Sequence, residues 1–407
     1  MIDYYETKSQ PITRLQVWEA YWKVRKNKGG MGIDGMSWKE LNANRDKQLY
    51  KLWNRLTSGS YFPPPVKEVE IDKKTGGKRK LGIPTILDRI AQEIVRSHLD
   101  KIMEPKFHEH SYGYRKGRNQ HQAVQKATSQ ALQYKWAIDI DIKGYFDTID
   151  HKLLLKAVQH YCKDKWVLMY IKRWLRAGII QKDGTATDRI LGTPQGGVIS
   201  PLLSNIFLHV VFDKWMDKRH PEKPFERFAD DIVVHCCSEK QALFVKSVIQ
   251  KRMSDCKLTM HPSKTQVVNF RGESKNRYPR KLDFLGFSIK LQMVKTKVGL
   301  KLMTTNVISS KSISSVLNKF REMKVHKMRG SIVQVSKRLS PVIRGIINYY
   351  CKFWNSHTFG IWKRLNDRLI KWVKWEKKKS VRAAIWWLKE VYRKKPGLFP
   401  HWKLVHP

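Results

Sequence analysis

The sequence has few cysteines, and their arrangement is uninformative for metal or disulfide frameworks. Five cysteines, Cys162, Cys236, Cys237, Cys256 and Cys351, are scattered along 407 residues, and no CxxC pair occurs. An odd number that includes a vicinal pair argues against a disulfide framework, and the missing CxxC pairs argue against a zinc finger. We therefore expect reduced thiols, as in the cytoplasm, and no structural zinc.

Long apolar runs are also missing. No stretch of eighteen or more apolar residues is present, and the N-terminal residues MIDYYETKSQ are polar, which argues against a signal peptide. Apolar residues still make up 41% of the chain, enough for the hydrophobic cores of two or three domains. The sequence thus predicts a folded cytoplasmic protein that does not enter a membrane.

Acidic residues are scarce relative to basic ones. The chain has 80 Lys and Arg against 35 Asp and Glu, a formal net charge of +45. Because such a protein repels itself unless a polyanion neutralises it, nucleic acid is the expected partner, with an anionic membrane surface as the other candidate. Residues 301–407 hold 25 Lys and Arg against four Asp and Glu, and seven of the fifteen Trp. A basic domain should therefore begin near 295–310, where the polar stretch 304–315 is typical of a connection.

The residue patterns predict an α+β body followed by a helical domain. In 361–375, apolar residues recur at four-residue steps with Lys and Arg on the other faces, which predicts an amphipathic helix. RFADDIVVHC (227–236) alternates on both sides of an acid pair and predicts a hairpin. Further strands are predicted over 66–72 and 136–142, and further helices over 86–103, 151–161 and 201–219.

Two groups of acids stand out in this basic chain. Asp230 and Asp231 lie at the predicted hairpin turn, and Asp139 and Asp141 lie two apart on a predicted strand, so that they share one face. An adjacent Asp pair is common in turns for local reasons, so this pair alone would not identify a site. Joining a 3′-hydroxyl to a nucleoside triphosphate, however, takes two Mg²⁺ ions about 3.5–4 Å apart, held by carboxylate oxygens. The two groups together predict such a site.

Further motifs stand in order along the chain, at 27–41, 76–95, 110–124, 141–151, 192–208, 228–231, 261–270, 282–289 and 336–355. Together they resemble the bacterial group II intron reverse transcriptase/maturases over nearly the whole chain. The resemblance implies a right-hand polymerase fold, with an N-terminal extension over 1–60, fingers and palm over 61–300, and a helical, basic thumb or maturase domain over 301–407. Phe228 departs from the usual Tyr of the acid motif. Because the chain ends soon after the thumb, we expect no C-terminal endonuclease domain.

The resemblance also implies roles for single residues. Asp141, Asp230 and Asp231 match the ligands of the two Mg²⁺ ions. Asp141 is preferred to Asp139 because the aromatic Phe146 follows it by five positions, as in the motif. Phe146 matches the residue that excludes ribonucleotides, and Lys73 and Arg79 match residues that bind the triphosphate of the dNTP. Gln195 and Gly196 match residues that pack under nucleotide and template, and Lys264 matches a candidate proton donor to pyrophosphate. RNA contact is implied for the basic faces of the thumb, which include Lys337, Arg338, Arg344, Lys363 and Arg364.

Simpler interpretations of these residues remain open. Phe146 could be a core aromatic, Lys73 and Arg79 part of a solvated charge run, the PQGG stretch a turn before a helix, and Lys264 a surface lysine. Three-dimensional proximity to the acids is what separates these interpretations.

The implied activity is RNA-directed DNA synthesis combined with assistance of intron splicing. The implied partners are group II intron RNA, an RNA template, a DNA primer or target, and dNTPs. Two other functions remain: a non-catalytic RNA chaperone, and a domesticated reverse transcriptase in defence, DNA repair or diversity generation. The acid cluster argues against a pure chaperone, because carboxylates without a metal would repel RNA.

Overall fold

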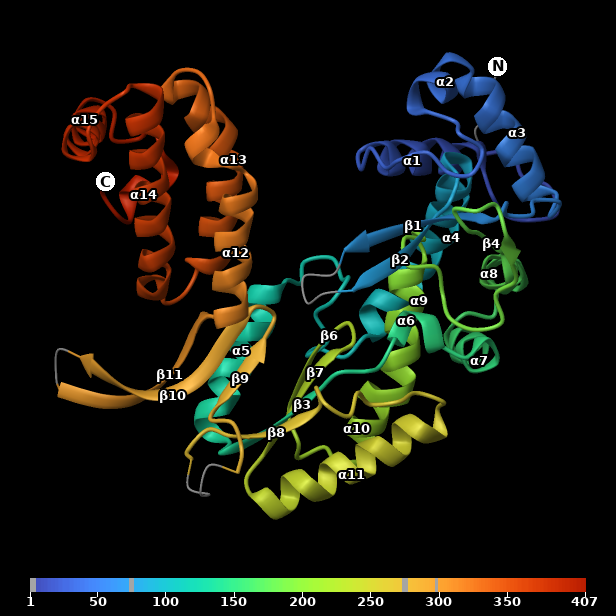
Figure 1. The fold of residues 1–407 in the computed structure, drawn as a ribbon. Coiled ribbons are helices and arrows are strands. Elements are labelled where there is room, and N and C mark those ends of the chain that lie inside the picture. Colours follow the sequence, from blue (N-terminus) through green and yellow to red (C-terminus); the bar gives the residue numbers. More distant parts are fainter. Residues whose placement is uncertain (1–4, 73–76, 273–276, 297–298) are drawn as a thin grey trace. The chain divides into compact units, whose positions relative to one another are not determined.

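The computed structural model describes the chain except for residues 1–4, 73–76, 273–276 and 297–298 (Figure 1). Contacts between residues group the chain into two compact units, each built from more than one segment. The first comprises Met1–Asn119, Ile138–Val234 and Leu243–Gln266, and the second comprises Gln120–Ala137, His235–Ala242 and Val267–Pro407. This grouping follows packing, and it differs from the functional division into extension, fingers and palm, and thumb, which stays a prediction.

The N-terminal helices of the first unit are defined by their caps. Thr13 and Ser37 each begin a helix with a reciprocal capping box, closed by the side chains of Gln16 and Glu40, which satisfies backbone donors that a helix start leaves free. These helices pack against one another and against the long helix α4. The bounds are α1 Arg14–Arg25, α2 Trp38–Ala43, α3 Arg45–Thr57 and α4 Ile86–Met103.

A small sheet next to these helices has the strand order β2-β1-β4-β5. The long antiparallel pair β1 and β2 places Ile71 opposite Arg79, and β1 continues into a parallel pairing with β4. The strand predicted over 66–72 and the helix predicted over 86–103 are confirmed with the same bounds. The strands are β1 Val66–Asp72, β2 Lys78–Ile83, β4 Ile179–Ile180 and β5 Ala186–Thr187.

The second four-stranded sheet carries the acid pair and has the order β6-β7-β3-β8. β6 and β7 form the predicted hairpin, in which Phe228 pairs with Asp231 across the turn. Boundaries between the two units fall inside β3, β7 and β8. The strands are β3 Trp136–Ile140, β6 Phe225–Phe228, β7 Asp231–Cys236 and β8 Gln266–Asn269.

The helix predicted over 201–219 exists, with one irregular turn in its middle. The α-helix of Ser200–Leu208 passes through a π-helical turn at His209–Asp213 and resumes at Lys214–Arg219. Single π-turns inside α-helices are frequent at functional sites, and this one presents Asp213 to the hairpin. Further helices in this part of the chain are α6 Tyr145–Thr148, α7 His151–Tyr161, α8 Lys165–Arg176 and α11 Glu239–Asp255, and a short 3-10 turn spans Glu104–Lys106.

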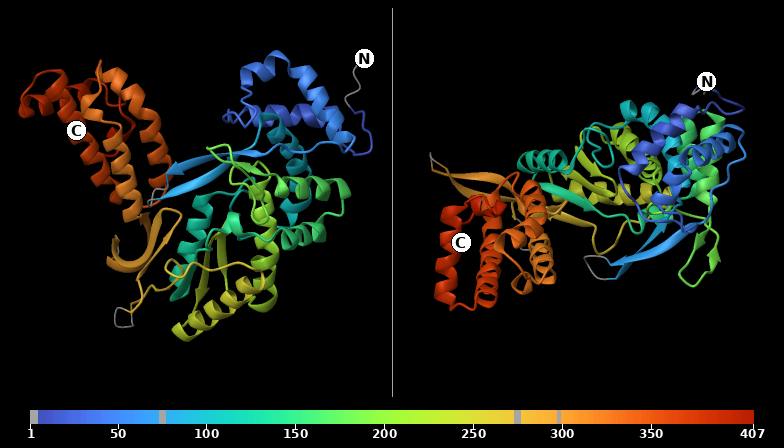
Figure 2. Two further views of the ribbon diagram at one scale, coloured as in Figure 1. Left: turned by 45° about the vertical axis from the view of Figure 1, so that its right-hand side comes forward. Right: turned by 90° about the horizontal axis from the view of Figure 1, so that it is seen from above.

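The second unit contains a three-stranded sheet of order β11-β10-β9, against which α5 packs. Figure 2 shows β10 and β11 as a long paired ribbon. The prediction that residues 304–315 form a polar connection is wrong. Residues 304–308 are the last part of strand β11, and the next helix begins at Ser310. Thr and Asn side chains are accommodated there because β11 pairs with β10 along ten residues. The bounds are α5 Gln120–Gln133, β9 Lys281–Phe284, β10 Phe287–Thr296 and β11 Gly299–Ile308.

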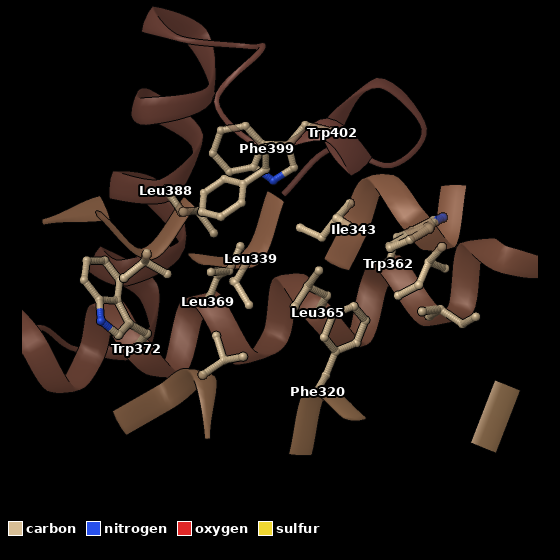
Figure 3. Packing of buried hydrophobic residues seen from close by; sticks show 14 of the residues in the cluster. Phe320, Leu339, Ile343, Trp362, Leu365, Leu369, Trp372, Leu388, Phe399 and Trp402 are labelled. Carbon is tan, nitrogen blue, oxygen red and sulfur yellow. The ribbon is translucent and has the colours of Figure 1, made fainter. Parts of the chain in front are cut away.

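The C-terminal helices surround one large hydrophobic cluster. Figure 3 shows side chains of α12 to α15 and of the C-terminal turn pointing toward one another, with Trp362, Leu365 and Leu369 along α14. The stripe predicted on residues 361–375 is buried over its whole length, as expected for a bundle helix. The bounds are α12 Ser310–Glu322, α13 Ile332–Tyr350, α14 Phe359–Glu376 and α15 Val381–Lys394, with 3-10 turns at Val325–Lys327, Asn355–Thr358 and Pro400–Lys403. Among the described residues, no helix is both long and apolar enough to cross a membrane.

Candidate active site

The turn between β6 and β7 has a strained backbone. Ala229 has a φ of 58°, a left-handed conformation that costs free energy for a residue with a side chain. The neighbouring backbone is in close contact: a Cβ added to Gly113 would lie 2.4 Å from the Ala229 nitrogen. Only glycine fits at 113, and the contact holds the turn that presents Asp230 and Asp231.

A buried ion pair lies behind this turn. The guanidinium of Arg227 donates from Nε to Asp213 Oδ1 at 2.7 Å and from Nη2 to Asp213 Oδ2 at 2.6 Å, and both side chains are inaccessible to solvent. Nη1 donates to Asn205 Oδ1 at 2.9 Å and to the Ala229 carbonyl at 3.2 Å. Burial disfavours ionisation of Asp213, but the charges and hydrogen bonds of Arg227 and His209 together outweigh it and lower the pKa of that carboxyl. Arg227 therefore ties the strained turn to the π-helical turn.

Asp141 is fixed by the loop that precedes β8. Its carbonyl accepts a hydrogen bond from the His261 backbone N–H at 2.7 Å, and its own N–H donates to Thr265 Oγ1 at 3.3 Å. The ammonium of Lys264 lies 3.2 Å from Asp141 Oδ2 and 3.4 Å from Oδ1. Lys264 is exposed, so solvent weakens this ion pair. Of the residues predicted for the site, Lys264 and Asp141 thus lie in direct contact.

The acids of the turn interact electrostatically with Asp141. Burial raises the pKa of Asp230, and the charge of Asp141 raises it further, whereas Arg79 and Lys264 act in the opposite direction. Burial also raises the pKa of Asp231 to about 7, together with the charges of Asp230, Asp139 and Asp141. The residue Asp231 is nevertheless exposed to solvent. The structure brings the predicted acids to one place, where a cation would relieve their mutual repulsion.

Two residues of this neighbourhood were not assigned a role from the sequence. Asp139 accepts a hydrogen bond from Gln266 Nε2 at 3.2 Å and acts on Asp231. Tyr114 has a φ of 56°, and the pKa of its hydroxyl is raised by burial and then by the charge of Asp230. Tyr114 directly follows Gly113, which contacts Ala229. No local sequence pattern indicates that contact, so the position of Tyr114 could not be predicted from the sequence.

The donor set suits a hard divalent ion. Carboxylate oxygens are the ligands that hard divalent cations prefer. Among the described residues, the only group of three His, Cys, Asp or Glu side chains with ligand atoms within 4.8 Å of one another lies elsewhere, at His98, Cys162 and Asp164. The acids of the turn and Asp141 therefore suit a divalent cation that also binds oxygen atoms of water or substrate.

Phe146 and its neighbour Asp147 contact the PQGG stretch and the residue before it. The half-buried Phe146 accepts a backbone hydrogen bond from Thr193 at 2.7 Å, and Gln195 Nε2 donates to both carboxylate oxygens of Asp147 at 3.0 and 3.1 Å. Gly196 has a φ of 119°, and a Cβ there would lie 2.7 Å from the Gly82 carbonyl. The contact with β2 thus requires a glycine at this position, and the predicted packing of Gly196 under nucleotide and template stays a prediction.

Gln92 of α4 accepts a hydrogen bond from the backbone just after the PQGG stretch. Its Oε1 accepts the Ile199 backbone N–H at 3.3 Å, and its Nε2 donates to the buried Asp88 carboxylate at 2.9 Å. Asp88 also accepts hydrogen bonds from Tyr61 and Trp174. The PQGG turn is therefore anchored to a rigid helix, as positioning of a substrate requires.

The remaining predicted residues are placed as follows. Arg79, on β2, is exposed and close enough to act on Asp230 and Tyr114. Lys73 lies outside the described residues. The five basic residues predicted for RNA contact are all exposed on α13 and α14: Lys337, Arg338, Arg344, Lys363 and Arg364.

Comparison with known proteins identifies two family matches. The model of the reverse transcriptase (RNA-dependent DNA polymerase) family matches residues 71–289, and that of the group II intron maturase-specific domain matches residues 313–392. The first family generally uses divalent metal ions for catalysis.

Individual relatives cover part of the chain. Protein YkfC of Escherichia coli (strain K12) is 38% identical over 46% of this chain and 50% of its own length. The group II intron-encoded protein LtrA of Lactococcus lactis subsp. cremoris is 35% identical over 50% of this chain and 35% of its own length. A solved telomerase structure from Candida albicans covers 90% of this chain and 67% of that chain, with 12% identity and a TM-score of 0.47. The matches thus span half or less of the length of the curated relatives.

Proposed function

Because the chain belongs to the reverse transcriptase (RNA-dependent DNA polymerase) family and carries a group II intron maturase-specific domain, we propose that it copies RNA into DNA and assists the splicing of a group II intron. The observation that carries the proposal is the grouping of Asp230 and Asp231, on a strained turn, with Asp141. A protein that only binds RNA has no use for repelling acids in a basic chain.

We propose that Asp141, Asp230 and Asp231 hold two Mg²⁺ ions. When bound, the ions would lower the pKa of the attacking 3′-hydroxyl and neutralise the charge on the triphosphate and pyrophosphate. The protein's own contribution is to keep the acids in place, through the ion pair of Arg227 with Asp213 and the hydrogen bonds around Asp141. The basic side chains of Arg79 and Lys264 lie near the acids, which supports binding of the triphosphate there.

We propose that Lys264 delivers a proton to the leaving pyrophosphate, and that Phe146 excludes ribonucleotides. The contact of Lys264 with Asp141 supports the first role, because it holds the ammonium beside the reacting groups. For Phe146, the support is that its backbone carbonyl accepts a hydrogen bond from Thr193 and lies close to Gly192. These contacts restrict movement of the residue away from a 2′-hydroxyl.

For the second unit we propose contact with intron RNA through the exposed basic residues of α13 and α14. Their high charge and the buried apolar stripes beneath them support binding to phosphates by a rigid helical surface. A cytoplasmic location is proposed from the reduced cysteines, all five of which are free in the structure.

The proposal is tested with purified protein, an RNA template annealed to a DNA primer, dNTPs and Mg²⁺, and separately with the intron RNA that surrounds the gene. We expect full-length DNA in the first assay and faster splicing at low Mg²⁺ in the second. Splicing without any DNA synthesis would favour the RNA chaperone. DNA synthesis without an effect on any flanking group II intron would favour a domesticated reverse transcriptase.

A further inference from the structure

Three potential metal ligands converge where α4 meets the segment between α7 and α8. Ligand atoms of His98, Cys162 and Asp164 all lie within 4.8 Å of one another. His98 Nε2 is 2.7 Å from Asp164 Oδ2, and the thiol of Cys162 is 3.5 Å from the same oxygen. No such group was expected, because the cysteine spacing lacks CxxC pairs. Here His98 lies on α4, far in the sequence from Cys162 and Asp164, which are two residues apart.

The orientation of Asp164 is unusual for its position. It is the N-cap residue of α8, where an aspartate normally accepts a hydrogen bond from the first turn of the helix. Its side chain makes no such bond and points to His98 and Cys162 instead. The helix thus lacks a stabilising side-chain cap, and one carboxylate oxygen of Asp164 contacts both other ligand atoms. This second observation separates the group from an ordinary surface ion pair.

We propose that His98, Cys162 and Asp164 form a Zn²⁺ site whose fourth position is taken by water. Imidazole, thiolate and carboxylate are the ligands that zinc uses, and a thiolate and a carboxylate together balance its charge. Tetrahedral bonds of about 2.0–2.3 Å place ligand atoms roughly 3.4–3.6 Å apart. The distance of 3.5 Å between Cys162 Sγ and Asp164 Oδ2 already fits this spacing. The shorter distance between His98 Nε2 and Asp164 Oδ2 would lengthen when zinc takes the place of the proton between them.

The accessibility of the three side chains is suited to a metal that binds from solution. Cys162 is buried, with 2% exposure, whereas the side chains of His98 and Asp164 are 34% and 45% exposed. The partly exposed pair can rotate to admit the ion, and binding releases the thiol proton to water. The ring of Trp166 packs edge-on against His98 at 5.0 Å and limits its positions.

Zinc at this site would join two helices that support the candidate active site. α4 carries Gln92, which holds the PQGG turn, and α8 carries Trp174, which donates to Asp88 of α4. A metal bridge at the start of α8 would therefore stabilise the base on which that turn rests. Because zinc binds the folded state and not the unfolded chain, it would raise the melting temperature.

The test uses the full chain, stripped of metal and titrated with Co²⁺ as a spectroscopic substitute for Zn²⁺. Excess Mg²⁺ is present to occupy the aspartates of the other site. We expect one equivalent of Co²⁺ to give the near-ultraviolet absorption of a cobalt–thiolate bond, and Zn²⁺ to abolish it by displacement. Cys162→Ser should lose the band, whereas Cys256→Ser, a matched change of another buried cysteine, should keep it.

Two further variants guard against loss of folding. Asp164→Asn preserves a good N-cap residue and His98→Gln preserves a polar side chain, and each should weaken Zn²⁺ binding about tenfold or more while circular dichroism is unchanged. Zn²⁺ should also raise the melting temperature of the parent protein and of Cys256→Ser only. No cobalt–thiolate band in the parent, or a band that survives in Cys162→Ser, would overturn the proposal.

Discussion

Arg227 and Asp213 form a two-point ion pair that is wholly shielded from solvent, at 2.6 and 2.7 Å, directly behind the turn that carries Asp230. The pair is formed between a strand and a π-helical turn, and it also reaches the carbonyl of the strained Ala229. Such a pair costs desolvation and adds little net stability, so its value lies in fixing one geometry.

We predict that Arg227→Lys weakens catalysis without preventing folding. A lysine keeps the charge but cannot make the two parallel bonds, so the turn gains freedom. Primer extension should fall about 10- to 100-fold, the usual effect of losing a residue that orients metal ligands, and the Mg²⁺ concentration for half-maximal rate should rise. Arg219→Lys, a matched change of an exposed arginine at the end of the helical segment Lys214–Arg219, serves as control. An unchanged Mg²⁺ requirement in Arg227→Lys would show that the ion pair is structural only.

Phe146→Val should relax discrimination against ribonucleotides. Removing the ring opens space where a 2′-hydroxyl would fit, and steric discrimination of this size is about 10- to 200-fold. The measurement is the ratio of kcat/KM for dNTP and rNTP in parent and variant, which makes each protein its own control. If both values fall by the same factor, Phe146 is a core aromatic.

Lys264→Ala distinguishes a proton donor from a surface lysine. A general acid contributes about 10²- to 10⁴-fold to the rate, whereas an exposed ion pair is worth about 1 kcal/mol or less. We expect kcat to fall by at least about 100-fold, with a changed pH profile, while the KM for dNTP changes little. A loss of only a few-fold in kcat would contradict the role proposed for Lys264.

The pH dependence of metal binding follows from Asp231. Its pKa of about 7 in the metal-free fold lies above the usual value near 3.9, so the folded state binds more protons than the unfolded chain between these pH values. Stability without metal should therefore fall as pH rises from about 4 to 7. Mg²⁺ needs the ionised carboxylate, and it should raise the melting temperature by a few degrees more at pH 8 than at pH 6.

Thermal melting with and without Mg²⁺ at these two pH values checks this prediction. Asp231→Asn removes the titrating group and should abolish the difference between them. Equal Mg²⁺ shifts at both pH values in the parent protein would contradict the assignment.

Local patterns sufficed for much of the fold. The strand at 66–72 and the helices at 86–103 and 151–161 were predicted with their observed bounds, because periodicity and caps are local. The stretch 304–315 was misjudged, because its Ser and Thr are typical of loops, while pairing of β11 with β10 depends on residues elsewhere.

The candidate site divides in the same way. The FADD turn and Asp141 were found from motifs, but the pairing of Arg227 with Asp213 and the contact of Gly113 with Ala229 are long-range. The close contact of Gly196 with Gly82 is also long-range, because the two residues lie 114 positions apart in the sequence. Residues whose role depends on such contacts need the structure.

The most direct test of the account is primer extension by Asp230→Ala, measured beside the affinity of the same variant for RNA. The account predicts that extension on an RNA template with Mg²⁺ falls by more than about 100-fold, since even partners of metal ligands cost about 10- to 100-fold. Affinity for RNA should stay within about twofold, because the Lys and Arg residues supply it. Asp46→Ala, an exposed acid on α3, should leave both unchanged. DNA synthesis at the parental rate in Asp230→Ala would contradict the account.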